Sequence, residues 1–337
     1  MQCTDFAEHL TQFLTVYLPA QKNASKNTIA SYRDTFKLLL QYCQEQKGIP
    51  AEKLTMHMLT HDLVADFLGW LETNRNCSIS TRNQRLTAIH SFFRYAQYEE
   101  PIGLANFQKV ISIPVKKAPK PDIPHLTTDA MQLLLSQPDK SAPKGRRDLT
   151  LLSVLYDSGC RVQELIDLKV RDVILTSPAV LILTGKGNKT RRVPLMKNTA
   201  SLLDSYIHEN NLELPWKSDY SLFTNKQHNK LTKEGVSYII SKYVTSARQV
   251  SSIVPERVTP HMFRHSKSVH LLQAGVNLIY IRDFLGHVDI QTTEVYAKCD
   301  TELKRRVIEN AYPELVDSDL PDWSQNTSLL NWLSSLK

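Results

Sequence analysis

The stretch SIPVKKAPKPDIPH, residues 112–125, divides this sequence into two parts of different character. It holds four prolines and three lysines. Proline fixes its own φ and removes a backbone donor, so a stretch of this kind stays extended and ends any helix that reaches it. We therefore expect a basic, proline-rich linker over residues 109–126, with a folded domain on each side.

The part before the linker, residues 1–108, has the apolar spacing of helices. In FAEHLTQFLTVYL, five large side chains recur at helical spacing: Phe6, Leu10, Phe13, Leu14 and Tyr17. Similar patterns that follow helix start signals predict further helices over residues 27–46, 61–72 and 78–93. Four short helices with short connections predict a compact helical bundle.

The part after the linker, residues 127–312, is expected to be a mixed α/β domain that is mostly helical. A Thr-Thr-Asp start signal opens its first helix, and a longer helix lies around residues 147–158. Between residues 170 and 195 the runs VRDVIL, AVLILT and RRVPL predict a small three-stranded antiparallel sheet. Helical periodicity then resumes and continues to about residue 311, so the predicted fold class is mainly α.

The C-terminal tail, residues 313–337, is predicted to be a spacer followed by a helix. Pro313 and Pro321 interrupt any helix across the acidic first part. Beyond them, an apolar stripe at i, i+3, i+4 and i+7 predicts an amphipathic helix: Leu329, Trp332, Leu333 and Leu336. An isolated helix of this length is marginal in water, so we expect it to dock on its own domain or on a neighbouring protomer.

The composition is that of an ordinary soluble protein, with 42% hydrophobic and 22% charged residues in 337. No apolar run approaches the roughly 20 residues that span a bilayer, and the first residues do not form a secretory signal. Five widely spaced cysteines fit reduced thiols. We therefore expect a cytoplasmic protein without a membrane partner.

Positive charge is concentrated in the second domain. The whole chain carries a net charge of +7, yet residues 1–108 hold ten basic and ten acidic side chains. The linker adds an excess of basic residues and the tail adds an excess of acidic ones, which leaves residues 126–312 with the remaining +7. A basic excess of this kind is compatible with a polyanionic partner such as nucleic acid.

Six polar residues follow one another across the second domain, in the strings GCRVQEL, GKGNKTRRVPL, HMFRH, FLGH and TTEVYAK. They are Arg161, Lys186, His261, Arg264, His287 and Tyr296. Five of them can donate to a phosphate, and the tyrosine can attack one. Phosphoryl transfer from DNA needs donors for the non-bridging oxygens, an acid for the leaving oxygen and an in-line nucleophile, and this set supplies each.

Taken singly, the residues of this series have plainer interpretations. Arg161 and Glu164 have the spacing of a common i, i+3 ion pair. Lys186 at a hairpin tip is ordinarily solvated. His287 could be satisfied by backbone carbonyls at a helix end, and a lone tyrosine such as Tyr296 is ordinarily an amphipathic core residue.

A metal site is the other interpretation of the histidines. His261 and His265 have the i, i+4 spacing of zinc ligands, but the glutamate of the HExxH motif is missing. No CxxC pair is present, and no carboxylate cluster suited to two metal ions accompanies the series. We therefore expect neither a metal nor another cofactor.

The ordered series resembles the catalytic signature of the tyrosine recombinases, the phage-integrase family of DNA breaking and joining enzymes, which includes mobile-element and Xer-like integrases. The resemblance covers nearly the whole chain, including STRNQRLTAIHSFFRYA in the front domain, and fades over residues 313–337. It implies a SAM-like core-binding domain and a catalytic domain that together clamp the duplex. It also implies four protomers assembled on two DNA sites.

The resemblance implies a role for each residue of the series. Tyr296 would attack the scissile phosphate and form a 3′-phosphotyrosyl bond, Lys186 would protonate the departing 5′-oxygen, and His261 would assist proton transfer at the tyrosine. Three further residues would stabilise the transition state, and a fourth would support the pocket: Arg161, Arg264, His287 and Glu164.

The partner implied by the resemblance is double-stranded DNA with paired recombination half-sites, bound by a homotetramer in synapsis. Candidate DNA contacts on the bundle and linker are basic or polar positions that we expect to be exposed: Lys26, Asn27, Arg82, Asn83, Arg85, Lys116, Lys117 and Lys120. Lysines on an extended tether could follow a phosphate backbone, although most exposed charges on a bundle are simply solvated.

Three other functions fit parts of the sequence. A type IB topoisomerase shares this chemistry but acts as a monomer, and a helical bundle joined by a short linker favours the recombinase. A catalytically silent DNA-binding protein is disfavoured because Arg161, Arg264 and Tyr296 are intact. A helical scaffold without a role in nucleic acid binding is disfavoured by the basic excess of residues 126–312.

Overall fold

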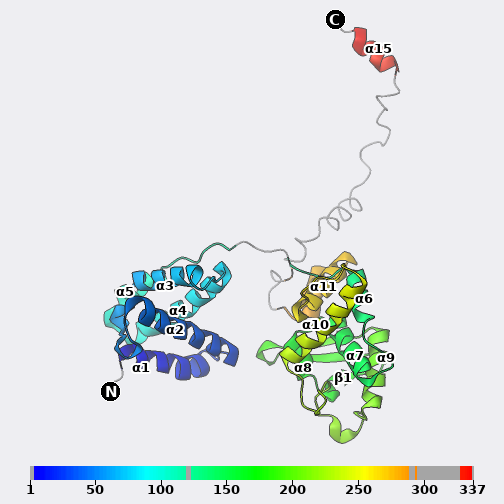
Figure 1. The fold of residues 1–337 in the computed structure, drawn as a ribbon, viewed down its shortest axis with the longest axis horizontal. Helices are drawn as coiled ribbons and strands as arrows, with labels where there is room; N and C mark the ends of the chain where they lie inside the picture. Colours follow the sequence, from blue (N-terminus) through cyan, green and yellow to red (C-terminus); the bar gives the residue numbers. More distant parts are fainter. Residues whose placement is uncertain (1–3, 119–122, 288–292, 294–326, 336–337) are drawn as a thin grey trace. The chain divides into compact units, whose positions relative to one another are not determined.

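The structure, a computed structural model, describes residues 4–118, 123–287, 293 and 327–335 (Figure 1). The chain divides into two units, Met1–Pro121 and Asp122–Lys337, and each has its own hydrophobic core. Within the described residues, no helix has the length and apolar character needed to cross a membrane.

The first unit is the predicted helical bundle, coloured blue to cyan in Figure 1. Its α-helices are α1 (Asp5–Gln12), α2 (Lys26–Lys47), α3 (His61–Thr73), α4 (Ile79–Glu99) and α5 (Leu104–Ile111). Shorter elements are the π-helix η1 (Phe13–Gln21) and the 3₁₀ turns η2 (Ala51–Lys53), η3 (Met56–Met58) and η4 (Pro101–Gly103). Ser25, Thr60 and Ser78 cap α2, α3 and α4, since each hydroxyl accepts a hydrogen bond from a first-turn N–H group.

Aromatic rings fill the centre of this bundle. Phe6 and Phe13, both on the predicted apolar face, are buried. The rings of Phe36 and Phe92 meet edge to face with centroids 5.0 Å apart, and Phe13 lies 5.4 Å from Phe92. This geometry adds to the stabilisation that burial of the rings provides.

The bundle extends further along the chain than the sequence predicted. The boundary expected after residue 108 falls inside α5, because Phe107 before it and Val110 after it pack in the same core. Ile113 is buried in that core as well. The helix escaped prediction because its N-cap, Gly103, offers no side chain that could signal a helix start.

The second unit is mostly helical with one small sheet. Its helices are α6 (Thr128–Leu135), α7 (Pro143–Asp157), α8 (Val162–Asp167), α9 (Lys197–Glu209), α10 (Lys233–Val250), α11 (Pro260–Gln273), α12 (Leu278–Leu285) and α15 (Thr327–Ser335). Its strands are β1 (Val173–Ile174), β2 (Val180–Thr184) and β3 (Thr190–Pro194). Its 3₁₀ turns are η5 (Val170–Asp172), η6 (Lys186–Asn188) and η7 (Pro215–Lys217).

The three strands form the predicted antiparallel sheet, in the order β1-β2-β3. Leu181 lies opposite Val193, and Leu183 lies opposite Arg191. Because residues directly opposite in a sheet share a face, these four side chains point to the same side. Leu181, Leu183 and Val193 are fully buried in the core of the unit, so Arg191 projects from the buried face of the sheet.

Helix α7 runs through the core and leads to the site. Nearly all of its second half is buried, including Leu151, Leu152 and Leu155. After it, Gly159 turns the chain with a φ of +56° and delivers Arg161 to the start of α8. A Cβ at Gly159 would lie 3.0 Å from Leu285 Cδ2, so this turn requires glycine both for its backbone conformation and for space.

Candidate active site

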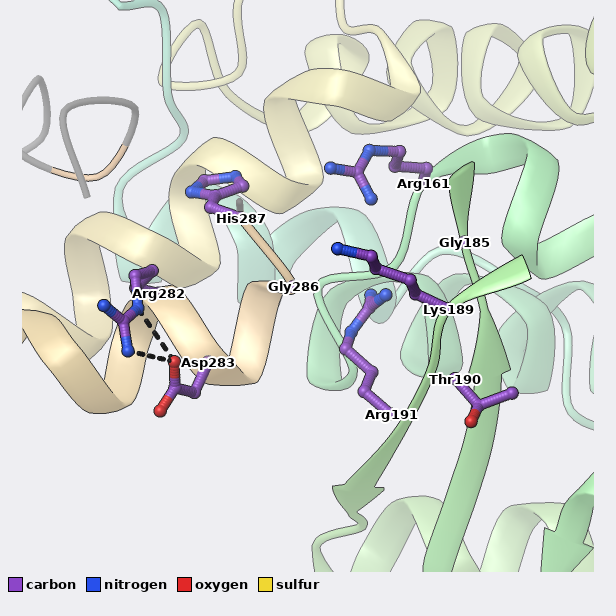
Figure 2. Close-up of a pocket in the computed structure, with 9 residues that line it drawn as sticks. All are labelled: Arg161, Gly185, Lys189, Thr190, Arg191, Arg282, Asp283, Gly286 and His287. Carbon is purple, nitrogen blue, oxygen red and sulfur yellow. Dashed lines mark hydrogen bonds and ion pairs between the residues drawn. The ribbon is translucent and has the colours of Figure 1, made fainter. Parts of the chain in front are cut away.

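Three segments of the second unit meet around a pocket of ≈ 570 Å³ (Figure 2). It is lined by Arg161, Gly185, Lys189, Thr190, Arg191, Arg282, Asp283, Gly286 and His287. Figure 2 shows Arg161 and Lys189 pointing across the pocket toward the side that carries His287. The one acid among the described lining residues, Asp283, pairs with Arg282 at 2.7 Å, so this wall has an excess of positive charge suited to an anion.

Arg161 stands at the beginning of α8 and is held there by Glu164. The carboxylate accepts from the backbone N of Arg161 at 2.9 Å and from its Nη1 at 2.8 Å. The arginine side chain remains 36% exposed, whereas that of Glu164 is 3% exposed. The predicted i, i+3 contact is therefore confirmed, and it fixes the guanidinium while leaving part of it open to the pocket.

Glu164 is shared between two arginines. Arg191 donates from Nη1 to Oε1 at 3.0 Å and from Nη2 to Oε2 at 2.8 Å. Burial alone would raise the pKa of Glu164, but the hydrogen bonds and charge of Arg191, together with the bonds from Arg161, lower that pKa to about 2. The carboxylate is therefore ionised throughout the neutral range.

This depressed pKa predicts a pH-dependent loss of stability in Glu164→Gln. A carboxyl group whose pKa is lower in the folded state stabilises the fold above its unfolded pKa, near 4.5, and that contribution is lost as pH falls toward 2. We expect the variant to be less stable than the unaltered chain at pH 7 by about 3 kcal/mol. Denaturant unfolding at a series of pH values should show the difference shrinking between about pH 4.5 and 2.

The matched control is Glu256→Gln, because the Glu256 side chain is 85% exposed and pairs only with Arg248 among the contacts that the structure describes. It should change stability little at any pH, as is usual for a surface ion pair. A stability difference for Glu164→Gln that stays constant from pH 7 to pH 2 would contradict the assignment.

Arg264 is buried between Gly159 and Leu285 and is not among the residues that line the pocket. Its Nη1 donates to the carbonyl of Gly159 at 2.7 Å, and its Nη2 donates to the carbonyl of Leu285 at 2.6 Å. These carbonyls lie two residues before Arg161 and two residues before His287. With 3% of its surface exposed, Arg264 ties α11 to both segments and contributes a buried positive charge to the site.

His287 lines the pocket directly after the end of α12. Gly286 ends the helix with a φ of +66°, and the backbone N of His287 donates to the carbonyl of Arg282. The ring Nδ1 lies 2.9 Å from Oγ1 of the buried Thr293. Burial, reinforced by the charges of Arg264, Arg161 and Arg191, lowers the pKa of His287 to about 4, so the imidazole is neutral at pH 7.

His261 lies in the first turn of α11, directly after Pro260 at the helix start. It is more exposed than Arg264, and partial desolvation with the charges of Arg264, Arg161 and Lys233 lowers its pKa. Its ring stacks on that of His265, with centroids 6.4 Å apart. Among the described residues, no group of three or more His, Cys, Asp or Glu is placed to hold a metal ion.

The hairpin that carries Lys186 closes tightly beside the pocket. The N–H of Gly185 donates to the carbonyl of Lys189 at 2.8 Å, and Gly187 has a φ of +76°. Gly185 itself lines the pocket, so the backbone at Lys186 adjoins it. The Lys186 side chain and the whole of Tyr296 lie outside the described part of the chain.

Several lining residues were missing from the sequence-based site, among them two cations that face the same wall as Arg161, namely Lys189 and Arg191. The strand TRRVP holds a signal for Arg191. Its side chain points to the same face of the strand as those of the apolar residues Val193 and Leu195, because these positions are two residues apart. An arginine in register with buried residues needs a buried partner. Lys189 has no comparable signal. It follows the glycine turn, where the local sequence does not determine the direction in which its side chain points.

The structure corrects the expectation that Arg82 is exposed. It is 5% exposed, and its Nη1 donates to the carbonyl of Pro114 at 3.1 Å. Its neighbour Asn83 donates to the carbonyl of Lys116 at 2.7 Å and accepts from the N–H of the same lysine at 3.1 Å. Arg82 and Asn83 therefore hold the beginning of the linker against the first unit.

The guanidinium of Arg85 also forms hydrogen bonds inside the bundle: its Nη1 donates to the carbonyl of Ser31 and to Oγ1 of Thr35. The other candidate contacts of this unit are exposed as expected: Lys26, Asn27, Lys116 and Lys117. Lys116 additionally pairs with Glu72 at 2.6 Å. Lys120 lies outside the described residues.

Comparison with known proteins identifies the family. Residues 124–302, more than half of the chain, match the phage integrase family, and residues 10–100 match the N-terminal SAM-like domain of phage integrases. The chain belongs to the phage integrase family. It is a tyrosine recombinase, an enzyme of site-specific DNA recombination, and both parts of the predicted architecture are those of this family.

Relatives match this integrase over nearly its full length. A protein of Sinorhizobium fredii, named as an integrase or recombinase (y4rC), is 35% identical over 329 residues, 97% of each chain. The tyrosine recombinase XerD of Staphylococcus haemolyticus is 31% identical over 88% of this chain and 96% of its own. The fold resembles that of the XerH site-specific recombinase bound to a difH substrate, with a TM-score of 0.67, 23% identity and coverage of 86% and 80% of the two chains.

Proposed function

We propose that this recombinase cuts and rejoins DNA strands at paired half-sites by using Tyr296 as the nucleophile. The tyrosine oxygen attacks the scissile phosphorus, the bond to the 5′-oxygen breaks, and a 3′-phosphotyrosyl bond holds the strand. Attack by a 5′-hydroxyl of the partner strand reverses these steps and releases the tyrosine. The observation that carries the proposal is the cationic pocket, in which Arg161 and Lys189 point toward the side of His287 and Arg191 lines the same wall.

The scissile phosphate fits this pocket because the cations are fixed before DNA arrives. Arg161 is oriented by Glu164, and Arg264 is locked by two carbonyls. Donors and charges that are already in place need no reorganisation as negative charge grows on the non-bridging oxygens. A neutral His287 adds a ring N–H donor to the same oxygens.

Two residues are assigned to proton movement. We assign Lys186, on the hairpin beside the pocket, to protonation of the leaving 5′-oxygen, since an ammonium group can deliver a proton that an arginine holds too tightly. His261 is assigned to the proton of Tyr296, because its lowered pKa keeps the imidazole unprotonated and able to accept at neutral pH.

The energy of the cleaved phosphodiester is kept in the phosphotyrosyl bond, so this scheme uses neither a metal nor a high-energy cofactor.

The test is covalent trapping. The substrate is a duplex selected for binding from a randomised pool and nicked at successive positions, so that the cleaved fragment diffuses away. We expect a protein–DNA adduct that forms in EDTA and maps to Tyr296. An adduct on another residue, or one that requires a divalent ion, would overturn the scheme.

The first unit is proposed to bind the duplex through its exposed polar positions. Lys26 and Asn27 open α2, where the helix N-terminus also favours a phosphate. Lys117 follows the linker segment that Asn83 secures. A few lysine–phosphate contacts of this kind would give salt-dependent binding without base specificity.

Assembly into a synaptic tetramer is proposed to use the tail. In α15, Trp332 and Leu333 are 58% and 47% exposed, consistent with an apolar stripe available for docking. The expected spacer over residues 313–322 lies outside the described residues. An exposed pair of large apolar side chains on a short helix suits docking on a neighbouring protomer.

Truncation after Asp322 should therefore separate binding from assembly. We expect single-site binding to change less than about threefold, since exposed tail residues contribute no DNA contact in this scheme. Tetramers on two sites and strand exchange should fall at least tenfold, as measured by native gel shift and recombinant product. Trp332→Ala should reproduce the loss. Normal assembly of the truncated chain, or its unfolding as a monomer, would contradict docking on a neighbour.

A further inference from the structure

Arg191 occupies an unusual position for a charged residue. It lies opposite Leu183 on the buried face of the sheet, two residues before the fully buried Val193. Its side chain is only 12% exposed, and part of it lines the active-site pocket. A buried arginine is retained at a cost in desolvation, so its contacts indicate what it does there.

The three side-chain nitrogens of Arg191 donate hydrogen bonds to two different segments. Nη1 and Nη2 form the bidentate pair with Glu164, and Nε donates to the carbonyl of Phe284 at 3.0 Å. The first segment carries Arg161, and the second leads to His287. Arg191 therefore joins the β2–β3 hairpin, the start of α8 and the end of α12 through one rigid, planar group.

The surrounding backbone leaves space for this group. A Cβ at Gly286 would lie 3.0 Å from Cδ and Nη1 of Arg191. A Cβ at Gly185 would lie 2.9 Å from Oε1 of Glu164. Both glycines line the pocket, so the close approach of Arg191 and Glu164 to the chain is built into the pocket wall.

The charge balance explains what this arrangement does for Arg161. Two guanidinium groups share one carboxylate, which leaves one net positive charge at this wall of the pocket. Without Arg191, Glu164 and Arg161 would form a neutral pair, and Arg161 would be drawn fully to the carboxylate. A phosphate would then compete with Glu164 for the same donors.

We propose that Arg191 is a positioning residue for strand cleavage, which acts through Glu164 to keep Arg161 available to the scissile phosphate. This inference rests on the proposed function, which places that phosphate at Arg161. It assigns Arg191 no contact with the reacting atoms.

The test compares Arg191→Ala and Arg191→Lys with a matched control, Arg192→Ala, the exposed next residue on the same strand. The nicked substrate defined above is used at saturating DNA, so that the rate reports cleavage and not binding. We expect Arg191→Ala to cleave on the order of 10²-fold more slowly, with DNA affinity changed less than about threefold. Arg191→Lys should recover only part of this loss, since one amine cannot reproduce the fork. Arg192→Ala should cleave normally.

A double-variant cycle distinguishes positioning from general damage. If Arg191 acts through Glu164, the cleavage loss caused by Arg191→Ala should largely vanish in a Glu164→Gln background. Rates are compared only for protein shown to be folded by thermal unfolding. Multiplicative losses in the double variant, or normal cleavage by Arg191→Ala, would overturn this inference alone. Absence of any adduct from the unaltered chain would overturn the proposed function and this inference with it.

Discussion

Tyr296→Phe is expected to bind DNA normally and to form no covalent adduct. The substitution removes one oxygen, which is the attacking atom in the proposed scheme, and retains the aromatic ring. Because no other group replaces a lost nucleophile, cleavage should fall by roughly 10⁴-fold or more. The measurement is adduct formation on the nicked substrate over time, with DNA affinity followed in the same preparation.

The matched control is Tyr280→Phe, which makes the same chemical change at a position of α12 that is 71% exposed and does not line the pocket. It should form the adduct at the unaltered rate. Two results would remove Tyr296 from its role: an adduct that persists in Tyr296→Phe, or loss of DNA binding that accounts for the missing adduct.

Elements that begin with a side-chain signal were predictable from the sequence. Ser25, Ser78 and Thr127 each cap the helix that follows, as expected, and the alternating runs of residues 170–195 form the predicted sheet. Helix α5 begins after Gly103 without such a cap, and it is stabilised by burial of Phe107 and Val110. That burial comes from the packing of α5 against α4 and α3, so it depends on the tertiary structure and not on a local start signal.

In the site, too, local arrangements could be predicted from the sequence, and contacts between distant segments could not. Arg161 with Glu164 and Gly286 with His287 are local arrangements, and both follow from spacing. Arg264 was expected in the site from the sequence, but its burial against the carbonyls of Gly159 and Leu285 does not follow from local spacing. The burial of Arg82 was not predicted for the same reason, because the carbonyl that accepts its hydrogen bond, that of Pro114, lies 32 residues away.

Lys186→Ala should lose most of its activity on normal DNA and regain it on a modified substrate. If this lysine is the general acid, its removal leaves the 5′-oxygen to depart unprotonated, at a loss of roughly 10²–10⁴-fold. A 5′-bridging phosphorothiolate releases a thiolate, which needs no proton. Cleavage of that substrate by Lys186→Ala should therefore approach the unaltered rate, measured in single-turnover reactions.

Lys189 makes this experiment decisive, because it is a second lysine on the same hairpin and its side chain lines the pocket. Lys189→Ala should be impaired equally on both substrates, since a lysine that contributes only charge is needed whichever group departs. Rescue of Lys189→Ala in place of Lys186→Ala would transfer the acid role to Lys189. Equal impairment of both variants on both substrates would mean that the hairpin only positions DNA, and that the leaving oxygen takes its proton from another group.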